Sequence, residues 1–198
     1  MTNLWDPDLY AKAWDFASLA HDGQTYGSSE KDKRVPYINH IGNVAMEVML
    51  ALNVSEESYD ANLALQCALL HDVVEDTEYT RDDIEAQFGA QVAQGVAALS
   101  KDESIQNKRD KMQDSLDRIK CLPTEIGMVK LADRITNLSE PPFYWTPEKI
   151  LDYCEEAKMI YNDLSQCNSH LARRLQSKID YYPTYAKKRA DETKAASA

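Results

Sequence analysis

The segment ALLHDVVEDT places four side chains with metal-binding or acid–base chemistry inside one apolar stretch. His71 and Asp72 fall within residues 60–74, the most apolar helix that the sequence predicts, and an unpartnered buried carboxylate is costly. Glu75 and Asp76 follow four positions later, and residues four apart share one face of a helix. One edge of a buried helix would therefore present an imidazole and three carboxylates, and a divalent cation is the simplest group that could hold them together.

A bare HD dipeptide is more typical of a core histidine paired with a neighbouring acid, but two further residues favour a metal site. His40 lies at the start of the preceding predicted helix, and Asp133 lies among apolar residues in the segment KLADRITNL. Three helices of a bundle can bring one set of ligands to a single point in the core. Imidazole and carboxylate donors suit Mn²⁺, Fe²⁺ or Zn²⁺, and geometry rather than affinity would select among these ions.

The elements that must position these residues are predicted to be helices, because apolar residues recur at helical spacing and no short window alternates cleanly. We expect helices over residues 7–21, 39–54, 60–74, 80–88, 90–100, 115–122, 124–138, 148–164 and 169–186. Thr80 and Asp83 predict a capping box at the start of one of them. Residues 22–36 predict a loop, and the highly charged residues 101–113 predict a partly mobile segment. The fold class is therefore an all-α, multi-helix bundle with a metal site in its core.

The length and composition are those of a single acidic domain. We assign residues 1–186 to one domain and residues 187–198 to a charged, frayed C-terminal tail. The net charge of −11 would repel phosphate backbones and disfavours nucleic-acid binding. The sequence contains no apolar run of about 18 residues, so no membrane span is predicted. The N-terminus shows no basic or apolar region of a secretory signal, so none is predicted. Four widely spaced cysteines favour a reduced, cytoplasmic protein, and homo-oligomers are left open.

The order H…HD…D, formed by His40, His71, Asp72 and Asp133, resembles the HD-domain metal-dependent phosphohydrolases. The segments AHDGQ, PYINH, ALLHDVVEDT, FGAQV and VKLADRITNL are similar to the hydrolase domain of the RelA/SpoT alarmone enzymes. The total length and the segment PPFYWTPEKILDY resemble the stand-alone small alarmone hydrolases. The combination of HDxxEDT with KLADRxxNL is far more specific than HD alone, and the resemblance covers roughly residues 9–165.

The resemblance implies a reaction and a role for each residue of the motifs. The implied metal ligands are His40, His71, Asp72 and Asp133, with Mn²⁺ expected and Zn²⁺ or Fe²⁺ as alternatives. Glu75 and Asp76 would position and deprotonate the attacking water, which a carboxylate pair beside a metal ion can do. The family removes the 3′-pyrophosphate of guanosine tetra- or pentaphosphate to give GDP or GTP. Because no segment has the length of a synthetase domain, the chain would degrade this purine nucleotide alarmone without making it.

Substrate contacts are implied as well. Tyr37 matches a position that lines the nucleotide pocket, and Asn137 matches a position near the ribose and the metal. Lys149 and Tyr153 match positions that face the phosphates and the ribose. Lys108 is our candidate for contact with the 5′-phosphates. We interpret the neighbouring cations Lys101 and Arg109 as part of a solvated charged face.

One departure from the family pattern concerns recognition of the purine base of the nucleotide. The family usually follows its H-x-x-Q segment with an arginine that stacks on guanine, whereas here Gln24 is followed by Thr-Tyr-Gly. Tyr26 could stack on a purine instead, because a phenol ring has a flat face. Alternatively, Lys31, Lys33 or Arg34 could supply the missing cation.

Three functions remain open from the sequence. The first is the hydrolysis of guanosine tetra- or pentaphosphate. The second is an HD hydrolase of another nucleotide, such as the adenosine analogue ppApp or the 2′-phosphate of NADPH. The third is a catalytically silent nucleotide-sensing module, which the presence of all four ligand residues and of Glu75 and Asp76 disfavours.

Overall fold

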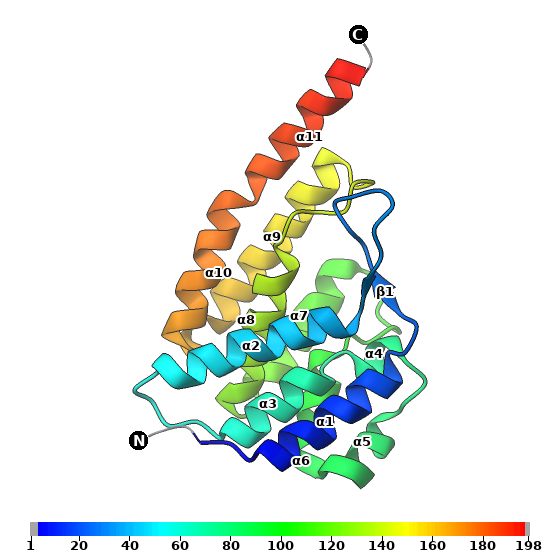
Figure 1. The fold of residues 1–198 in the computed structure, drawn as a ribbon. Helices are drawn as coiled ribbons and strands as arrows, with labels where there is room; N and C mark the ends of the chain where they lie inside the picture. The colour runs from blue at the N-terminus through cyan, green and yellow to red at the C-terminus, as the bar shows by residue number, and fades with distance from the viewer. Residues whose placement is uncertain (1–3, 197–198) are drawn as a thin grey trace.

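The computed structural model describes residues 4–196, and most of them are helical (Figure 1). The helices are α1 (Pro7–Ala20), α2 (Ile38–Val54), α3 (Ala61–Leu70), α4 (Val73–Asp76), α5 (Arg81–Phe88), α6 (Ala90–Leu99), α7 (Lys108–Lys120), α8 (Thr124–Asn137), α9 (Pro147–Leu164), the 3-10 helix η1 (Ser165–Cys167), α10 (Ser169–Tyr181) and α11 (Pro183–Ala196). The two strands are β1 (Thr25–Tyr26) and β2 (Val35–Pro36). The predicted all-α, multi-helix bundle is confirmed.

Helices α3 and α8 form the centre of the core. Nine of the ten residues of α3 are buried, and α8 is buried without interruption from Glu125 to Ile135. Helix α2 packs against both of them, and α6, α9 and α10 pack around them. The approach of α6 to the centre depends on Gly95, because a Cβ there would lie 2.6 Å from Ile126 Cδ1. Close packing therefore sets the positions of the central helices. The start of α2 and the ends of α3 and α8 lie beside the predicted site.

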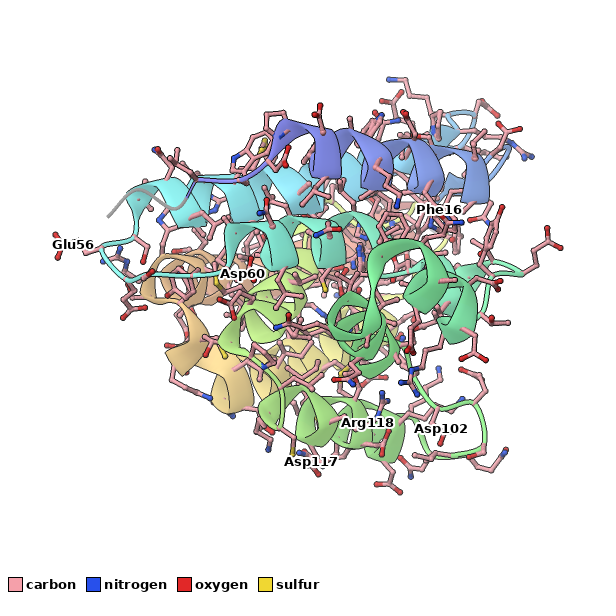
Figure 2. The ribbon with its side chains drawn as sticks, turned by 90° about the horizontal axis from the view of Figure 1, so that it is seen from below. Phe16, Glu56, Asp60, Asp102, Asp117 and Arg118 are labelled. Carbon is pink, nitrogen blue, oxygen red and sulfur yellow. The ribbon has the colours of Figure 1, made fainter. Side chains whose placement is uncertain are left out.

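The helix ends follow local hydrogen-bonding rules. The predicted capping box of α5 is confirmed, since Asp83 N–H donates to Thr80 Oγ1 and Thr80 N–H donates to Asp83 Oδ2. Asp60 caps α3 by accepting from Leu63 N–H at 3.0 Å, and Figure 2 shows it at the start of that helix. Asn107 caps α7, which begins earlier than expected. Residues 108–113, where the sequence predicted no helix, form the first turns of α7, and the mobility of the charged segment stays a prediction.

The expectation of no strand is wrong within residues 22–36. Here β1 and β2 pair antiparallel, with Thr25 opposite Pro36 and Tyr26 opposite Val35. Each strand has two residues, which is too short for an alternating pattern to show in the sequence. The pair fixes the backbone of Tyr26 next to the start of α2.

The expected frayed tail is wrong for residues 187–196. Helix α11 continues through the predicted domain end at residue 186, and its outer part extends beyond the body of the molecule (Figure 1). Residues 197 and 198 lie outside the described residues, and the domain boundary itself stays a prediction. Among residues 4–196, no helix combines the length and the hydrophobicity that crossing a bilayer demands.

Candidate active site

The HD motif lies at a break between two helices, not within one helix as the sequence suggested. Helix α3 ends at Leu70, a turn holds His71 and Asp72, and α4 begins at Val73. Asp76 N–H still donates to the Asp72 carbonyl at 2.8 Å, so the turn and α4 form one compact corner. The expected single carboxylate edge is therefore wrong in detail, because the side chains at this corner point to different partners.

Four predicted metal ligands converge beneath this corner. The His71 Nε2 atom lies 3.0 Å from Asp72 Oδ2 and 3.3 Å from His40 Nε2. Asp133 Oδ1 completes the group at 3.4 Å from His40 Nε2 and 3.9 Å from His71 Nε2. An ion bound at about 2.0–2.2 Å from each donor fits among atoms with these separations. His40, His71 and Asp72 thus form a candidate site for a divalent metal ion, and Asp133 borders it.

The charges of the cluster are those that a cation would balance. Burial opposes a charge on His40, but hydrogen bonds with Asp133 and Asp72 outweigh it and raise the pKa of His40 to about 10. Burial also opposes a charge on Asp133 and Asp72, yet the pKa values of both carboxyl groups fall below their usual range. The main opposing causes are the charge of Lys130 for Asp133 and that of His71 for Asp72. The positive charges of the protonated imidazoles here offset the negative charges of the buried carboxylates. A divalent ion would replace those protons, so the donor set fits a metal.

Neighbouring groups orient the ligands. His71 Nδ1 lies 2.8 Å from the carbonyl oxygen of Ala68, which accepts a hydrogen bond from it and leaves Nε2 facing the cluster. Asn137 Nδ2 donates to Asp133 Oδ1, and buried Lys130 Nζ lies 3.4 Å from Asp133 Oδ2. Asn137 therefore lies beside the candidate metal ligands, where the sequence placed it, whereas sequence reasoning missed Lys130.

Tyr37 connects the ligand set to Asp76. Its hydroxyl oxygen lies 2.6 Å from Asp72 Oδ2 and 3.0 Å from Asp76 Oδ2, and its single proton is shared between them. Burial and the charge of Asp72 raise the pKa of Tyr37, so the hydroxyl stays protonated. Burial and the Asp72 charge also raise the pKa of Asp76. Tyr37 was expected to line the nucleotide pocket, and its hydroxyl instead contacts two carboxylates.

The AHDGQ motif supports the same corner from outside. His21 Nδ1 and Gln24 Oε1 are 2.8 Å apart, and Gln24 Nε2 donates to the Asp76 carbonyl at 2.9 Å. The His21 ring also stacks on the Tyr37 ring at 4.8 Å between centroids. His21 therefore packs against Tyr37 and contacts Gln24.

A cavity of about 510 Å³ opens beside α4 and is lined by groups from α4, α7 and α9. Its walls include four lysines, Lys101, Lys108, Lys111 and Lys149, and four acidic residues, Glu75, Glu103, Asp152 and Glu156. Glu75 also lines it, and its Oε1 pairs with Lys101 Nζ at 2.8 Å while its Oε2 accepts from the Lys101 amide at 3.0 Å. The interpretation of Lys101 as part of a solvated charged face is therefore wrong, because the loop after α6 turns it inward.

Helix α7 fixes this loop. Arg118 Nη2 donates to the carbonyl oxygen of Ser100 at 2.8 Å, directly before Lys101. In Figure 2, Arg118 and Asp102 lie together on the side of the molecule opposite α1. The sequence pattern gave no signal for this contact, because it joins a half-buried side chain of α7 to an irregular loop.

The predicted substrate residues fall into two groups. Lys108, Lys149 and Tyr153 line the cavity, and the Tyr153 ring lies 4.1 Å from the guanidinium of buried Arg134. Tyr26 is absent from this lining; its ring centroid lies 6.4 Å from that of His40, and its side chain is partly open to solvent. Tyr26 thus lies beside the candidate metal ligands, whereas the other three residues line the cavity.

Comparisons with known proteins point in one direction. The sequence profile of the HD domain matches residues 13–169. The chain is 31% identical over 166 residues to guanosine-3′,5′-bis(diphosphate) 3′-pyrophosphohydrolase MESH1 of Danio rerio, an alignment covering 82% of this chain and 87% of that protein. It is 34% identical over 142 residues to guanosine-3′,5′-bis(diphosphate) 3′-pyrophosphohydrolase of Vibrio cholerae, covering 68% of this chain and 18% of that longer protein.

A solved structure agrees with the sequence relatives. It is described as a metazoan ortholog of SpoT that hydrolyzes ppGpp and plays a role in starvation responses. The match has a TM-score of 0.76 at 25% sequence identity and covers 89% of this chain and 97% of that one.

Proposed function

The chain belongs to the HD-domain family, and we propose that it hydrolyses guanosine tetra- and pentaphosphate by removing the 3′-pyrophosphate. The observation that carries this function is the buried cluster of two imidazoles and two carboxylates directly beside a cavity lined by lysines. The relatives that match most of their own length are stand-alone pyrophosphohydrolases of similar size. The protein is therefore a phosphoric ester hydrolase that degrades the alarmone.

We assign the metal site to His40, His71, Asp72 and Asp133, and we propose Mn²⁺ as its ion, with Zn²⁺ and Fe²⁺ as alternatives. Support comes from the convergence of the four side chains and from their mixed imidazole and carboxylate donors. When bound, a divalent ion supplies a water nucleophile near neutral pH and draws charge from the phosphoryl oxygens. Lys130 and Asn137 hold Asp133 in place for this role.

Asp76 and Glu75 are proposed to handle the attacking water. Asp76 has a pKa raised by burial and by the charge of Asp72, which brings a carboxylate closer to the range of an effective proton acceptor. Tyr37 keeps Asp76 next to Asp72 through its shared hydroxyl. Glu75 is held at the cavity wall by Lys101, where it can orient the water relative to the incoming phosphate.

The lysine-lined cavity is proposed to bind the phosphates of the nucleotide. Lys108 and Lys149 provide positive charge there, and Tyr153 forms the wall toward the ribose. Local cations are needed because the protein as a whole carries a charge of −11 and repels polyanions. Lys101 joins this group by its position, although its Nζ pairs with Glu75.

Tyr26 is proposed to stack on the purine, because β1 holds its partly exposed ring beside the metal cluster. A phenol ring stacks on either purine, so this contact supports the adenosine analogue ppApp as a second substrate. We further propose that the protein acts in the cytoplasm. The four cysteines support this, since all are free thiols and three of them are buried.

Identification of the products tests the proposed function. The protein is incubated with guanosine tetraphosphate and a divalent ion, and the nucleotide and phosphate products are separated by chromatography. We expect GDP and pyrophosphate in equal amounts. Stepwise release of single phosphates would instead indicate a phosphomonoesterase, and no release from any of ppGpp, ppApp and NADPH would support a silent nucleotide-sensing module.

A further inference from the structure

Helix α11 is connected to the α8–α9 loop, residues 138–146, by two cations. Lys188 Nζ pairs with Glu140 Oε1 at 3.0 Å on the surface, and Arg189 reaches the backbone of the loop. Arg189 Nη1 donates to the carbonyl oxygens of Pro142 at 3.2 Å, of Phe143, and of Trp145 at 2.9 Å. Within residues 4–196, Arg189 forms an ion pair with Glu192 on the same helix. One side chain thus satisfies three backbone acceptors of an irregular loop, two of them part-buried.

The same loop is joined on its other side to the connection between β1 and β2. Phe143 N–H donates to the Ser28 carbonyl at 3.2 Å. The contact is close, because a Cβ added at Gly27 would lie 2.8 Å from Pro142 Cγ. Figure 1 shows the two loops side by side above the strands. The position of the α8–α9 loop therefore affects the hairpin that carries Tyr26.

The loop also supplies a wall of the lysine-lined cavity. Trp145 lines the cavity, and its ring meets the Tyr153 ring edge-on at 5.1 Å between centroids. Lys149 Nζ lies 4.5 Å from the centre of the Trp145 ring, which holds this cation by a cation–π contact. A displacement of Trp145 would thus displace both Lys149 and Tyr153.

We propose that Arg189 is a positioning residue for substrate binding, acting through the α8–α9 loop. It holds the loop in the shape in which Trp145 orients Lys149 and Tyr153 on one side, while the loop supports the Tyr26 hairpin on the other. This inference rests on the proposed function for the identity of the substrate. The hydrogen bonds of Arg189 go to the loop and not to the metal cluster, so its loss affects nucleotide binding more than the chemical step.

The test compares two variants that each remove one positive charge from α11. Arg189→Gln removes the loop contacts, and Lys187→Gln changes an exposed residue two positions away. The first readout is hydrogen exchange at the amides of Phe143 and Trp145, which donate to Ser28 and Pro142 and require no substrate. The second is the KM and kcat for guanosine tetraphosphate, with the affinity for Mn²⁺ as a check on the metal cluster.

We expect faster exchange at both amides and a KM raised about tenfold in Arg189→Gln, with kcat and Mn²⁺ affinity within about twofold of the wild type. Lys187→Gln should have the exchange rates and KM of the wild type. The KM of Arg189→Lys should lie between those of the wild type and Arg189→Gln, because an ammonium retains three donors. Unchanged exchange and unchanged KM in Arg189→Gln would overturn the proposal, as would a loss confined to kcat. If the wild type hydrolyses no nucleotide, the proposed function fails. The exchange measurement would still show whether Arg189 holds the α8–α9 loop in place.

Discussion

Replacing Tyr37 by phenylalanine removes one hydroxyl and leaves the ring in place. That hydroxyl lies 2.6 Å from Asp72 Oδ2 and 3.0 Å from Asp76 Oδ2. The ring stacked on His21 should stay where it is, because the aromatic contact at 4.8 Å does not involve the oxygen. The variant therefore separates two roles for Tyr37, a wall of the nucleotide pocket and a link between a proposed metal ligand and a proposed proton acceptor.

The size of the effect follows from the contacts. The single proton of Tyr37 makes one charge-assisted hydrogen bond that is shared between two carboxylates, and such a bond contributes about 1.5–3 kcal/mol. Removing a hydrogen-bond partner of a metal ligand typically costs about 10–100-fold in metal affinity or activity, which is the same range. We therefore expect kcat or the Mn²⁺ affinity to fall about 10–100-fold, with KM for the nucleotide nearly unchanged.

The assay is steady-state turnover of guanosine tetraphosphate over a series of Mn²⁺ concentrations. This series separates a fall in kcat from a fall in Mn²⁺ affinity. Tyr181→Phe is the matched control, because Tyr181 is exposed on α10 and its ring contacts Tyr185. A Tyr37→Phe protein with wild-type kcat and wild-type Mn²⁺ dependence would refute the link through the hydroxyl. A rise in KM alone would instead favour a direct contact between Tyr37 and the nucleotide.

Three further predictions concern other parts of the site and the core. Asp72→Ala should lose bound metal and turnover together, whereas Glu75→Ala should retain the metal, as measured by metal analysis, and lose turnover; equal metal loss in both would contradict the assigned roles. Lys101→Met should lower kcat about tenfold, because Glu75 would keep its contact with the backbone amide but lose the 2.8 Å ion pair, and wild-type kinetics would show that the pair has no catalytic role. Gly95→Ala should lower the free energy of unfolding in urea by about 1 kcal/mol, since overpacking against Ile126 outweighs the gain in helix propensity; a more stable protein would argue against tight packing of α6.

The sequence predicts those parts of the fold that depend on regular periodicity. The apolar spacing of residues 124–138 predicts α8 to within a residue, and the Thr80–Asp83 pair predicts the start of α5. The site is predicted from residue chemistry, because carboxylates and imidazoles in apolar helices need a common partner. The structure brings His40, His71, Asp72 and Asp133 together, and their roles as metal ligands stay a prediction.

Other features escape the sequence because they depend on contacts between distant segments. The break of the helix at His71 leaves the apolar pattern of residues 60–74 intact, so periodicity predicts a continuous helix. Lys101 belongs to a charged stretch, and its inward direction follows from the position of α7. The helical state of residues 187–196 accompanies the contact of Arg189 with the α8–α9 loop, which a charged composition does not reveal.

The central claim is that the cluster of His40, His71, Asp72 and Asp133 holds the ion on which hydrolysis depends. The most direct measurement is a titration of Mn²⁺ into metal-free protein, in which bound ion and turnover of guanosine tetraphosphate are followed in the same samples. We predict that turnover is absent in chelator and rises in parallel with binding until one ion per chain is bound. Full turnover by metal-free protein in chelator, or binding of the ion without any release of pyrophosphate, would contradict the account.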